Sequence, residues 1–331
     1  MRQYQSQVVR KIPGIIVCIV IALSTGFLSE NYGGPQLLYA LLIGLSLHFL
    51  YSNEHVRPGI DFSSKTILRI GVALLGIRIT FGDIGEIGFS AAAIVVFAVA
   101  TTVVLGAVFA RILGFSRDFG LIAGGSVGIC GASAALAVAS VLPKTKANEQ
   151  FTLLVVVGVT VLSTIAMVVY PFVLQMLDIG SMDAGIFIGT TIHDVAQVVA
   201  AGMLFGPEAG DVSTVVKLFR VALLLPVVLV ISIFFASHSS EKIGIQSLKL
   251  IPPFLIGFVA LSLITSMQMV SPTTVESIST ISRWMLVIAI AAAGLKTNFQ
   301  ELAQLGWKPV ILLVVETLYI ALVAAGLMAL L

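Results

Sequence analysis

The sequence predicts an all-α polytopic membrane protein, in which about ten or eleven transmembrane helices form a single integral membrane transporter domain over residues 1–331. Hydrophobic residues make up 58% of the chain and charged residues only 10%, whereas a soluble domain carries roughly 25% charged residues. The mean hydropathy is +1.10. No water-soluble fold hides so much apolar surface, so we expect the lipid bilayer to surround the chain.

Apolar runs bounded by Pro, Gly and charged residues define the candidate helices. In order, they cover residues 12–29, 35–50, 64–80, 88–112, 119–141, 150–176, 183–204, 212–236, 246–268, 279–296 and 306–330. The first run follows Arg2, Arg10 and Lys11 and superficially resembles a signal peptide. Because further apolar spans follow directly, we expect it to be an uncleaved transmembrane helix.

The distribution of Lys and Arg predicts the orientation. With a cytoplasmic N-terminus, twelve of the 18 basic residues fall inside, and the other six, Arg78, Lys144, Lys146, Lys217, Arg220 and Arg283, fall outside. This bias favours a cytoplasmic N-terminus and, with an odd number of spans, a periplasmic or extracellular C-terminus. The net charge of +2 gives no indication of a nucleic-acid partner.

Two distant segments resemble each other without gaps. Residues 76–89, GIRITFGDIGEIGF, align with residues 294–307, GLKTNFQELAQLGW, and Arg78 matches Lys296. A general preference of helix ends for Gly and a cation explains Gly76 and Arg78. It does not explain the Phe, the acidic residue and the second Gly that the two segments share at matching positions. In the predicted topology the two copies end helices at opposite membrane faces, as inverted transporter repeats require.

Residues 124–140, GGSVGICGASAALAVAS, form a poor ordinary helix, because each Gly costs about 1 kcal/mol relative to Ala. The segment predicts a broken or closely crossed helix, with Ser126, Gly128, Gly131 and Ser133 as candidate binding residues. Free N–H groups and the positive end of a half-helix favour an anion. The alternative is that the small residues only let helices pack closely.

Residues 189–202, GTTIHDVAQVVAAG, place ionisable groups in the middle of an apolar span, where they are costly and therefore functional candidates. Helical spacing would put His193 and Gln197 on one face, with Asp194 turned away as a coupling or orienting residue. Thr190 and Thr191 would cap this helix or its second half, and both are candidate substrate-binding residues together with His193 and Gln197. The alternative is a structural His193 and Asp194 pair that holds helices together.

Imidazole titrates near neutral pH, so His193 is a candidate anion-binding cation, proton carrier or metal ligand. Metal is the least favoured of the three, since no second His or Cys stands at ligand spacing. No metal and no cofactor are therefore expected.

Other charged residues in or near the spans have competing interpretations. Arg78 and Lys296 are candidate gates, or they snorkel to the interface. Lys217 and Arg220 are expected to anchor the outer end of their helix in the same way. Glu316, alone in the last span, is either a proton site or a buried partner for a cation.

The segments IHDVAQVVAAG and SVGICGASA, with GIRITF, resemble the YeiH family of bacterial membrane proteins, which are described as sulfate exporters. The resemblance covers nearly the whole chain. It implies a bacterial inner-membrane protein with inverted repeats, related to the folds of sodium/proton antiporters and bile-acid transporters. It implies a small anion as substrate more firmly than sulfate itself.

These observations favour a secondary transporter that exports a small anion by alternating access, coupled to protons or sodium or uncoupled. The rival functions are a cation/proton antiporter that uses Asp194, an intramembrane enzyme and a channel. We expect no enzymatic activity, since the sequence offers no large soluble loop to hold a polar substrate and no phosphate-binding loop. A homodimer remains an alternative to a monomer.

Overall fold

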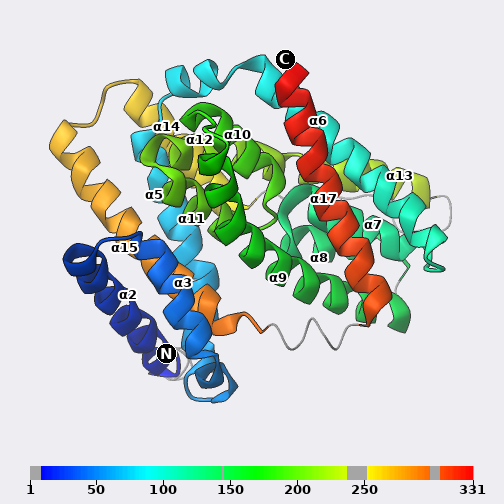
Figure 1. The fold of residues 1–331 in the computed structure, drawn as a ribbon, viewed down its shortest axis with the longest axis horizontal. Helices are drawn as coiled ribbons and strands as arrows, with labels where there is room; N and C mark the ends of the chain where they lie inside the picture. Colours follow the sequence, from blue (N-terminus) through cyan, green and yellow to red (C-terminus); the bar gives the residue numbers. More distant parts are fainter. Residues whose placement is uncertain (1–8, 144, 237–251, 299–305, 331) are drawn as a thin grey trace. The chain divides into compact units, whose positions relative to one another are not determined.

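The computed structural model describes residues 9–143, 145–236, 252–298 and 306–330. These residues form α-helices with short 3-10 and π-helical turns, and no strand occurs among them (Figure 1). The predicted all-α fold class is confirmed.

The helices follow one another with short connections. In chain order they are α2 (Ile12–Tyr32), α3 (Gln36–Ser46), η1 (His48–Ser52), α4 (Arg57–Phe62), η2 (Ser63–Ile67), α5 (Leu68–Leu75), η3 (Gly76–Arg78), α6 (Phe81–Ile112), α7 (Arg117–Gly125), η4 (Ser126–Cys130), α8 (Ala132–Val141), α9 (Lys146–Met176), α10 (Ser181–Thr191), α11 (Val195–Phe205), α12 (Pro207–Ala222), α13 (Leu224–Ala236), α14 (Pro253–Ser266), α15 (Pro272–Lys296) and α17 (Trp307–Leu330).

The predicted spans coincide with single helices or with runs of consecutive helices. Within the described residues, six segments are long and apolar enough to cross a membrane alone: α2, α6, α9, α12 with α13, α15 and α17. The other spans correspond to shorter or interrupted helices, namely α3, the run from η2 to η3, α7 with α8, α10 with α11, and α14. Residues 246–251 of the ninth span lie outside the described part. The count of about eleven crossings stays a prediction.

The chain divides into two compact units, and the first comprises Met1–Glu86 and Pro253–Asn298. Within it, α15 packs against α2, α3 and α5, while α14 packs against α5. The helices approach closely where glycines meet. A Cβ on Gly14 of α2 would lie 2.0 Å from the Val56 carbonyl oxygen, and one on Gly59 of α4 would lie 2.1 Å from that of Lys11. Small residues therefore allow backbone contact between α2 and α4, as is common in membrane helices.

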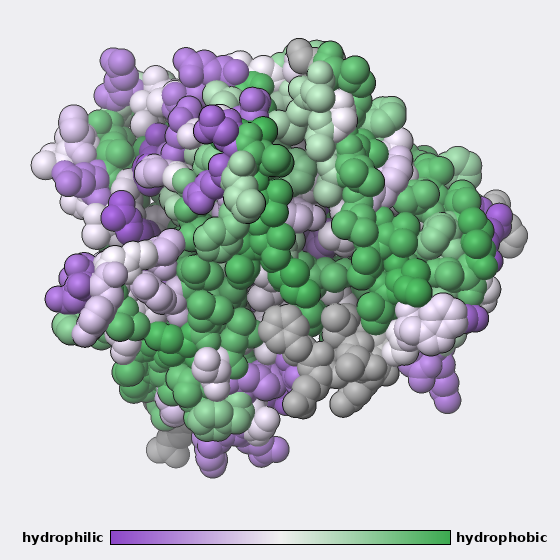
Figure 2. All heavy atoms as spheres, viewed as in Figure 1, coloured by the Kyte–Doolittle hydropathy of each residue, from purple (hydrophilic) through white to green (hydrophobic). Residues whose placement is uncertain are grey.

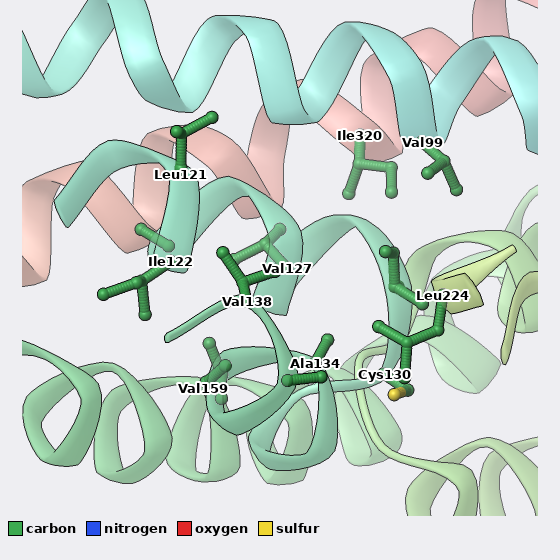
Figure 3. Close-up of a cluster of buried hydrophobic side chains, with 14 of the residues drawn as sticks. Val99, Leu121, Ile122, Val127, Cys130, Ala134, Val138, Val159, Leu224 and Ile320 are labelled. Atoms are coloured by element: carbon green, nitrogen blue, oxygen red, sulfur yellow. The ribbon is translucent and has the colours of Figure 1, made fainter. Parts of the chain in front are cut away.

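The second unit comprises Ile87–Pro252 and Phe299–Leu331. In it, α12 packs against α10 and α11, and α17 packs against α7, α9 and α10. A buried apolar cluster surrounds the interrupted helix formed by α7, η4 and α8, with Val127, Cys130 and Ala134 near the interruption (Figure 3). Apolar atoms also cover the exposed side of α17 (Figure 2). An apolar exterior around a packed interior fits a lipid environment.

The two aligned segments share local backbone features. Gly88 has φ +79° and interrupts α6, and its match, Gly306, has φ +81° directly before α17. Gly76 and Gly294 each sit in a close helix contact, because a Cβ there would lie 2.3 Å from the Phe258 carbonyl oxygen and 2.5 Å from that of Leu41, respectively. These equivalences support the alignment. Residues 299–305 of the second copy lie outside the described residues, and the inverted relation stays a prediction.

Candidate functional site

The first interrupted helix breaks at residues 126–131. The π-helical turn η4 follows α7, and Gly131 then adopts φ +57° and ψ −128° before α8 begins. The Ser126 hydroxyl donates to the Gly131 carbonyl at 2.8 Å, and the Gly131 N–H donates to the Ser126 carbonyl at 2.8 Å. The predicted break is confirmed. Ser126 shapes it, because its hydroxyl already has an acceptor in the turn.

The second break lies between α10 and α11. Ile192 has ψ 139°, and Asp194 is extended with φ −100° and ψ 145°, so residues 192–194 leave the helix. The prediction of a continuous helix over 183–204 was wrong here, and the argument that placed His193 and Gln197 on one helical face does not apply. The helices α10 and α11 have 11 residues each. At 1.5 Å per residue each is about 16 Å long, which is about half the thickness of a bilayer core of about 30 Å.

The two breaks meet within the second unit. A Cβ on Gly131 would lie 3.7 Å from the carbonyl oxygen of His193. Gly131 and His193 thus bring the two segments that the sequence singled out into contact. We call this meeting point, residues 126–131 and 192–194, the crossing.

Two fully buried cations on α12 bind the crossing. The Lys217 ammonium donates to the carbonyls of Ile129 at 2.7 Å and Ile192 at 2.9 Å. The Arg220 guanidinium donates to the carbonyls of Gly128 at 2.5 Å and Ile192 at 2.8 Å, and also to that of Val127. The expectation that Lys217 and Arg220 anchor the outer end of their helix was therefore wrong.

A helix that stops inside the protein explains these contacts. The last carbonyls of an α-helix have no intrahelical N–H partner, and the aligned peptide dipoles give that end partial negative charge. The run of α7 and η4 ends at the crossing, and so does α10. Lys217 and Arg220 supply both the missing donors and the compensating charge. They lie three residues apart, which places them on the same side of α12.

Three buried side chains near the second break have polar atoms with no hydrogen-bond partner among the described residues. They are Thr190 through Oγ1, His193 through Nδ1 and Gln197 through Oε1, and all three side chains are at most 1% exposed. Thr191 differs, because its hydroxyl donates to the Phe187 carbonyl at 2.7 Å within α10. Buried polar groups are normally satisfied, so Thr190, His193 and Gln197 mark where a ligand or water would bind.

The His193 side chain is positioned by a contact with the last helix, α17. Its Nε2 lies 2.9 Å from the Thr317 hydroxyl of α17, and that hydroxyl donates to the Leu313 carbonyl at 2.7 Å. Since the Thr317 proton is committed to Leu313, Thr317 accepts from Nε2–H. Asp194 is half-buried, and its backbone N–H donates to the Ser163 hydroxyl at 3.1 Å. No sequence pattern pointed to Thr317 or Ser163, which come from other spans.

The remaining predicted residues are not among the three buried side chains with unpaired polar atoms. Ser133 is exposed on α8, and Gly128 contributes its carbonyl to Arg220. In the first unit, Arg78 ends η3, and Lys296 forms an ion pair with Asp61 at 2.9 Å. A gating role for Arg78 and Lys296 stays a prediction. Among the residues described, no three His, Cys, Asp or Glu side chains are grouped to hold a metal ion.

The Lys296 pair should contribute little to stability. Burial raises the pKa of the Asp61 carboxyl, but the hydrogen bond and charge of Lys296 outweigh it and leave the pKa below its ordinary value of 3.8. Because the folded pKa is lowered, the pair stabilises the fold above that value and stops doing so as the pH falls through the lowered pKa. Both side chains are about one third exposed, at 32% and 33%.

We therefore expect Lys296→Ala to lower the free energy of unfolding by at most about 1 kcal/mol at neutral pH, and by less in acid. Thermal unfolding in detergent at both pH values measures this, with the exposed Lys146→Ala as the control. A loss of several kcal/mol would contradict a solvent-screened pair.

The fold and the crossing define a polytopic, all-α membrane protein with two helices interrupted at a shared centre, where the buried basic side chains Lys217 and Arg220 bind backbone carbonyls. The chain belongs to the family described as Conserved hypothetical protein 698, whose model matches residues 13–313. The family resemblance drawn from the sequence is thereby confirmed.

Relatives in several bacteria share most of the chain. A UPF0324 membrane protein of Chlorobaculum tepidum is 44% identical over 318 residues, which is 96% of this chain and 89% of the relative. UPF0324 membrane proteins named TauZ from Paracoccus pantotrophus and Paracoccus denitrificans are each 43% identical. Those matches cover 95% and 93% of this chain and 94% and 92% of the relatives. Each similarity extends along the whole fold and is consistent with a multi-pass membrane protein.

Proposed function

We propose that the protein is a secondary transporter that moves a small anion by alternating access, with the anion bound at the crossing. The observation that carries this proposal is the pair of fully buried cations, Lys217 and Arg220, at the meeting point of two broken helices. Discontinuous helices that meet near the midplane are where many secondary transporters bind their substrates. Lys217 interacts electrostatically with the Asp194 carboxylate, and Arg220 adds a second basic group, so the two basic side chains favour negative charge at the crossing.

Several groups at the crossing can bind an anion. The Lys217 ammonium has three N–H donors, two of which are committed to carbonyls. The hydroxyl of Thr190, which has no partner among the described residues, can donate a further hydrogen bond. The helices α8 and α11 begin at the crossing, so their first N–H groups and their partial positive charge also favour an anion.

The cation/proton antiporter is less well supported by this arrangement. A sodium ion at Asp194 would have to bind close to Lys217, which interacts electrostatically with the same carboxylate. Like charges at short range in a low-dielectric interior repel strongly. The repulsion favours an anion over a cation at the crossing.

The finer parts of the proposal rest on the sequence. The family resemblance favours a sulfur oxyanion such as sulfate and export across the bacterial inner membrane. The positive-inside bias favours a cytoplasmic N-terminus. Twelve basic residues were assigned to the cytoplasmic side and six to the outer side. Two of those six, Lys217 and Arg220, are fully buried and no longer count toward the outer side, so the bias is larger.

Replacing Thr190 by Val should weaken anion binding by about tenfold or more, because a hydrogen bond to a charged group contributes about 1.5 to 3 kcal/mol. The Thr190 hydroxyl has no partner among the described residues, so the substitution should leave folding intact. Thermal-shift titrations of purified protein with sulfate, sulfite, sulfonates and small carboxylates, with and without sodium, measure the effect.

The matched control is Thr25→Val, since Thr25 is equally buried in the first unit and its hydroxyl donates to the Ala22 carbonyl at 2.8 Å. The control should bind anions as the wild type does. Stabilisation of the wild type by sodium alone would replace the proposal with the cation antiporter. Equal anion affinities of the wild type and Thr190→Val would exclude Thr190 from the site.

A further inference from the structure

Glu316 is a buried carboxyl group with no assigned role in anion binding. It lies on α17 with 0% exposure, and neither carboxyl oxygen has a hydrogen-bond partner among the described residues. Buried ionisable side chains in membrane helices normally pair with another group or take part in function. An unpaired one therefore requires an explanation.

The surroundings of Glu316 are formed by backbone and apolar groups. A Cβ on Gly106 of α6 would lie 2.6 Å from Glu316 Oε1, 2.6 Å from the Gly120 carbonyl oxygen and 2.9 Å from the Gly124 Cα atom. The helices α6, α7 and α17 thus converge at glycines, and the carboxyl group fills the space that a side chain on Gly106 would occupy. Apolar side chains of the same three helices, Val99, Leu121 and Ile320, lie in the adjoining core (Figure 3).

Among the described residues, no charged group offsets a negative charge at Glu316. The elements around it are α6, α7, η4, α9 and α10. Their titratable side chains are Asp83, Glu86 and Arg111 on α6, Arg117 and Asp118 on α7, Cys130 on η4, Lys146, Glu149 and Tyr170 on α9, and Asp183 on α10. None of these side chains, and neither Lys308 nor Tyr319 of α17, forms a hydrogen bond with the Glu316 carboxyl.

The charge state follows from this environment. Burying an isolated carboxylate is far more costly than burying the neutral acid, so a buried carboxyl without a partner binds a proton instead. In the conformation described here, Glu316 is therefore neutral. Ionisation requires a rearrangement that gives the group access to water or to a cation.

Glu316 is also connected to the crossing. The next residue, Thr317, accepts the hydrogen bond from His193 at 2.9 Å. A carboxylate at Glu316 would place negative charge one residue from the side chain that holds His193, and it would disfavour an anion at the crossing. A proton on Glu316 removes that repulsion.

We propose that Glu316 is the proton-binding site that couples protons to anion binding. This inference rests on the proposed function. A proton from the aqueous phase binds a Glu316 carboxylate oxygen when the anion binds, and it returns to water when the anion leaves. Anion affinity of the wild type should then fall by up to tenfold per pH unit once Glu316 ionises.

The test compares the wild type with Glu316→Gln, which keeps the shape of the neutral acid. Sulfate affinity is measured by calorimetry between about pH 5 and about pH 9, so that binding is compared in acid and in base. The variant should bind sulfate with the low-pH affinity of the wild type at every pH. Glu149→Gln, an exposed carboxyl on α9, is the matched control and should behave as the wild type.

Infrared spectroscopy of the same proteins reports the proton directly, without any anion. The band of a protonated carboxyl should be present in the wild type and in Glu149→Gln, and missing in Glu316→Gln. Identical bands in all three proteins would overturn the proposal. Persistence of the pH dependence in Glu316→Gln would also overturn it and would assign the effect to His193.

Failure of every tested anion to bind the wild type would instead contradict the proposed function, while the infrared band still decides whether Glu316 carries the proton.

Discussion

Replacing Arg220 with methionine is expected to lower the free energy of unfolding by about 3 to 5 kcal/mol, the usual cost of removing one partner from a buried charged network. Methionine has a similar length but no donor. The carbonyls of Val127 and Gly128 would lose the contacts that Arg220 makes, whereas Ile192 would keep Lys217. Denaturation in mixed micelles measures the loss.

The control for this substitution is Arg111→Met, because Arg111 is exposed on α6. Its expected effect is within about 0.5 kcal/mol, as for most surface substitutions. Arg220→Lys should fall between the two, since an ammonium cannot reproduce the planar set of donors that contacts several carbonyls at once. Wild-type stability of Arg220→Met would mean that the guanidinium does not support the broken helices.

The second large effect is expected at Gly120, where α7 touches α6. A Cβ on Gly120 would lie 2.3 Å from the Gly106 carbonyl oxygen and 2.8 Å from the Ala107 Cα atom. Backbone atoms cannot rotate away, so Gly120→Ala must push the two helices apart. We expect a loss of about 3 kcal/mol, at the upper end for overpacked cores, despite the better helix propensity of Ala.

Gly128→Ala is a matched control for the Gly120 substitution. The nearest atom to a Cβ on Gly128, the Val99 carbonyl oxygen, would lie at 3.5 Å, which is ordinary contact. Its unfolding free energy should change by less than about 1 kcal/mol, because no volume is forced on a neighbour. Equal melting temperatures for Gly120→Ala and the wild type would show that α6 and α7 are not packed backbone to backbone.

Much of the architecture could be predicted from local composition. The apolar run at 306–330 matches α17, which spans Trp307–Leu330, since a span is a local property of about 20 residues. The first break was also predictable, because the glycines of 124–131 disfavour a helix where they stand. The second break was not predicted. Residues 192–194 contain neither Gly nor Pro, and only the polar pair His193 and Asp194 marked the place.

The contacts of the site depend on residues far apart in the chain. His193 meets Thr317 at a separation of 124 residues, and Arg220 meets Val127 at a separation of 93. Nothing local distinguishes Thr317 from other threonines of apolar helices. Lys217 and Arg220 did carry a signal, since two cations three residues apart within an apolar run are costly unless they face the interior. They were assigned to the membrane surface because the helix was expected to begin at residue 212, close to both cations. The helix α12 begins earlier, at Pro207.

The two buried cations also bear on how the chain enters the membrane during synthesis. In the span formed by α12 and α13, Lys217 and Arg220 lie near the centre, so the span partitions poorly into lipid by itself, at about 2.5 to 3.5 kcal/mol for each charge on insertion scales. The carbonyls that accept their hydrogen bonds, in residues 127–129 and at Ile192, belong to segments that precede α12 in the chain. Those segments leave the ribosome first, so the acceptors are present when the cations arrive, and α12 can enter the bilayer against protein rather than against lipid alone.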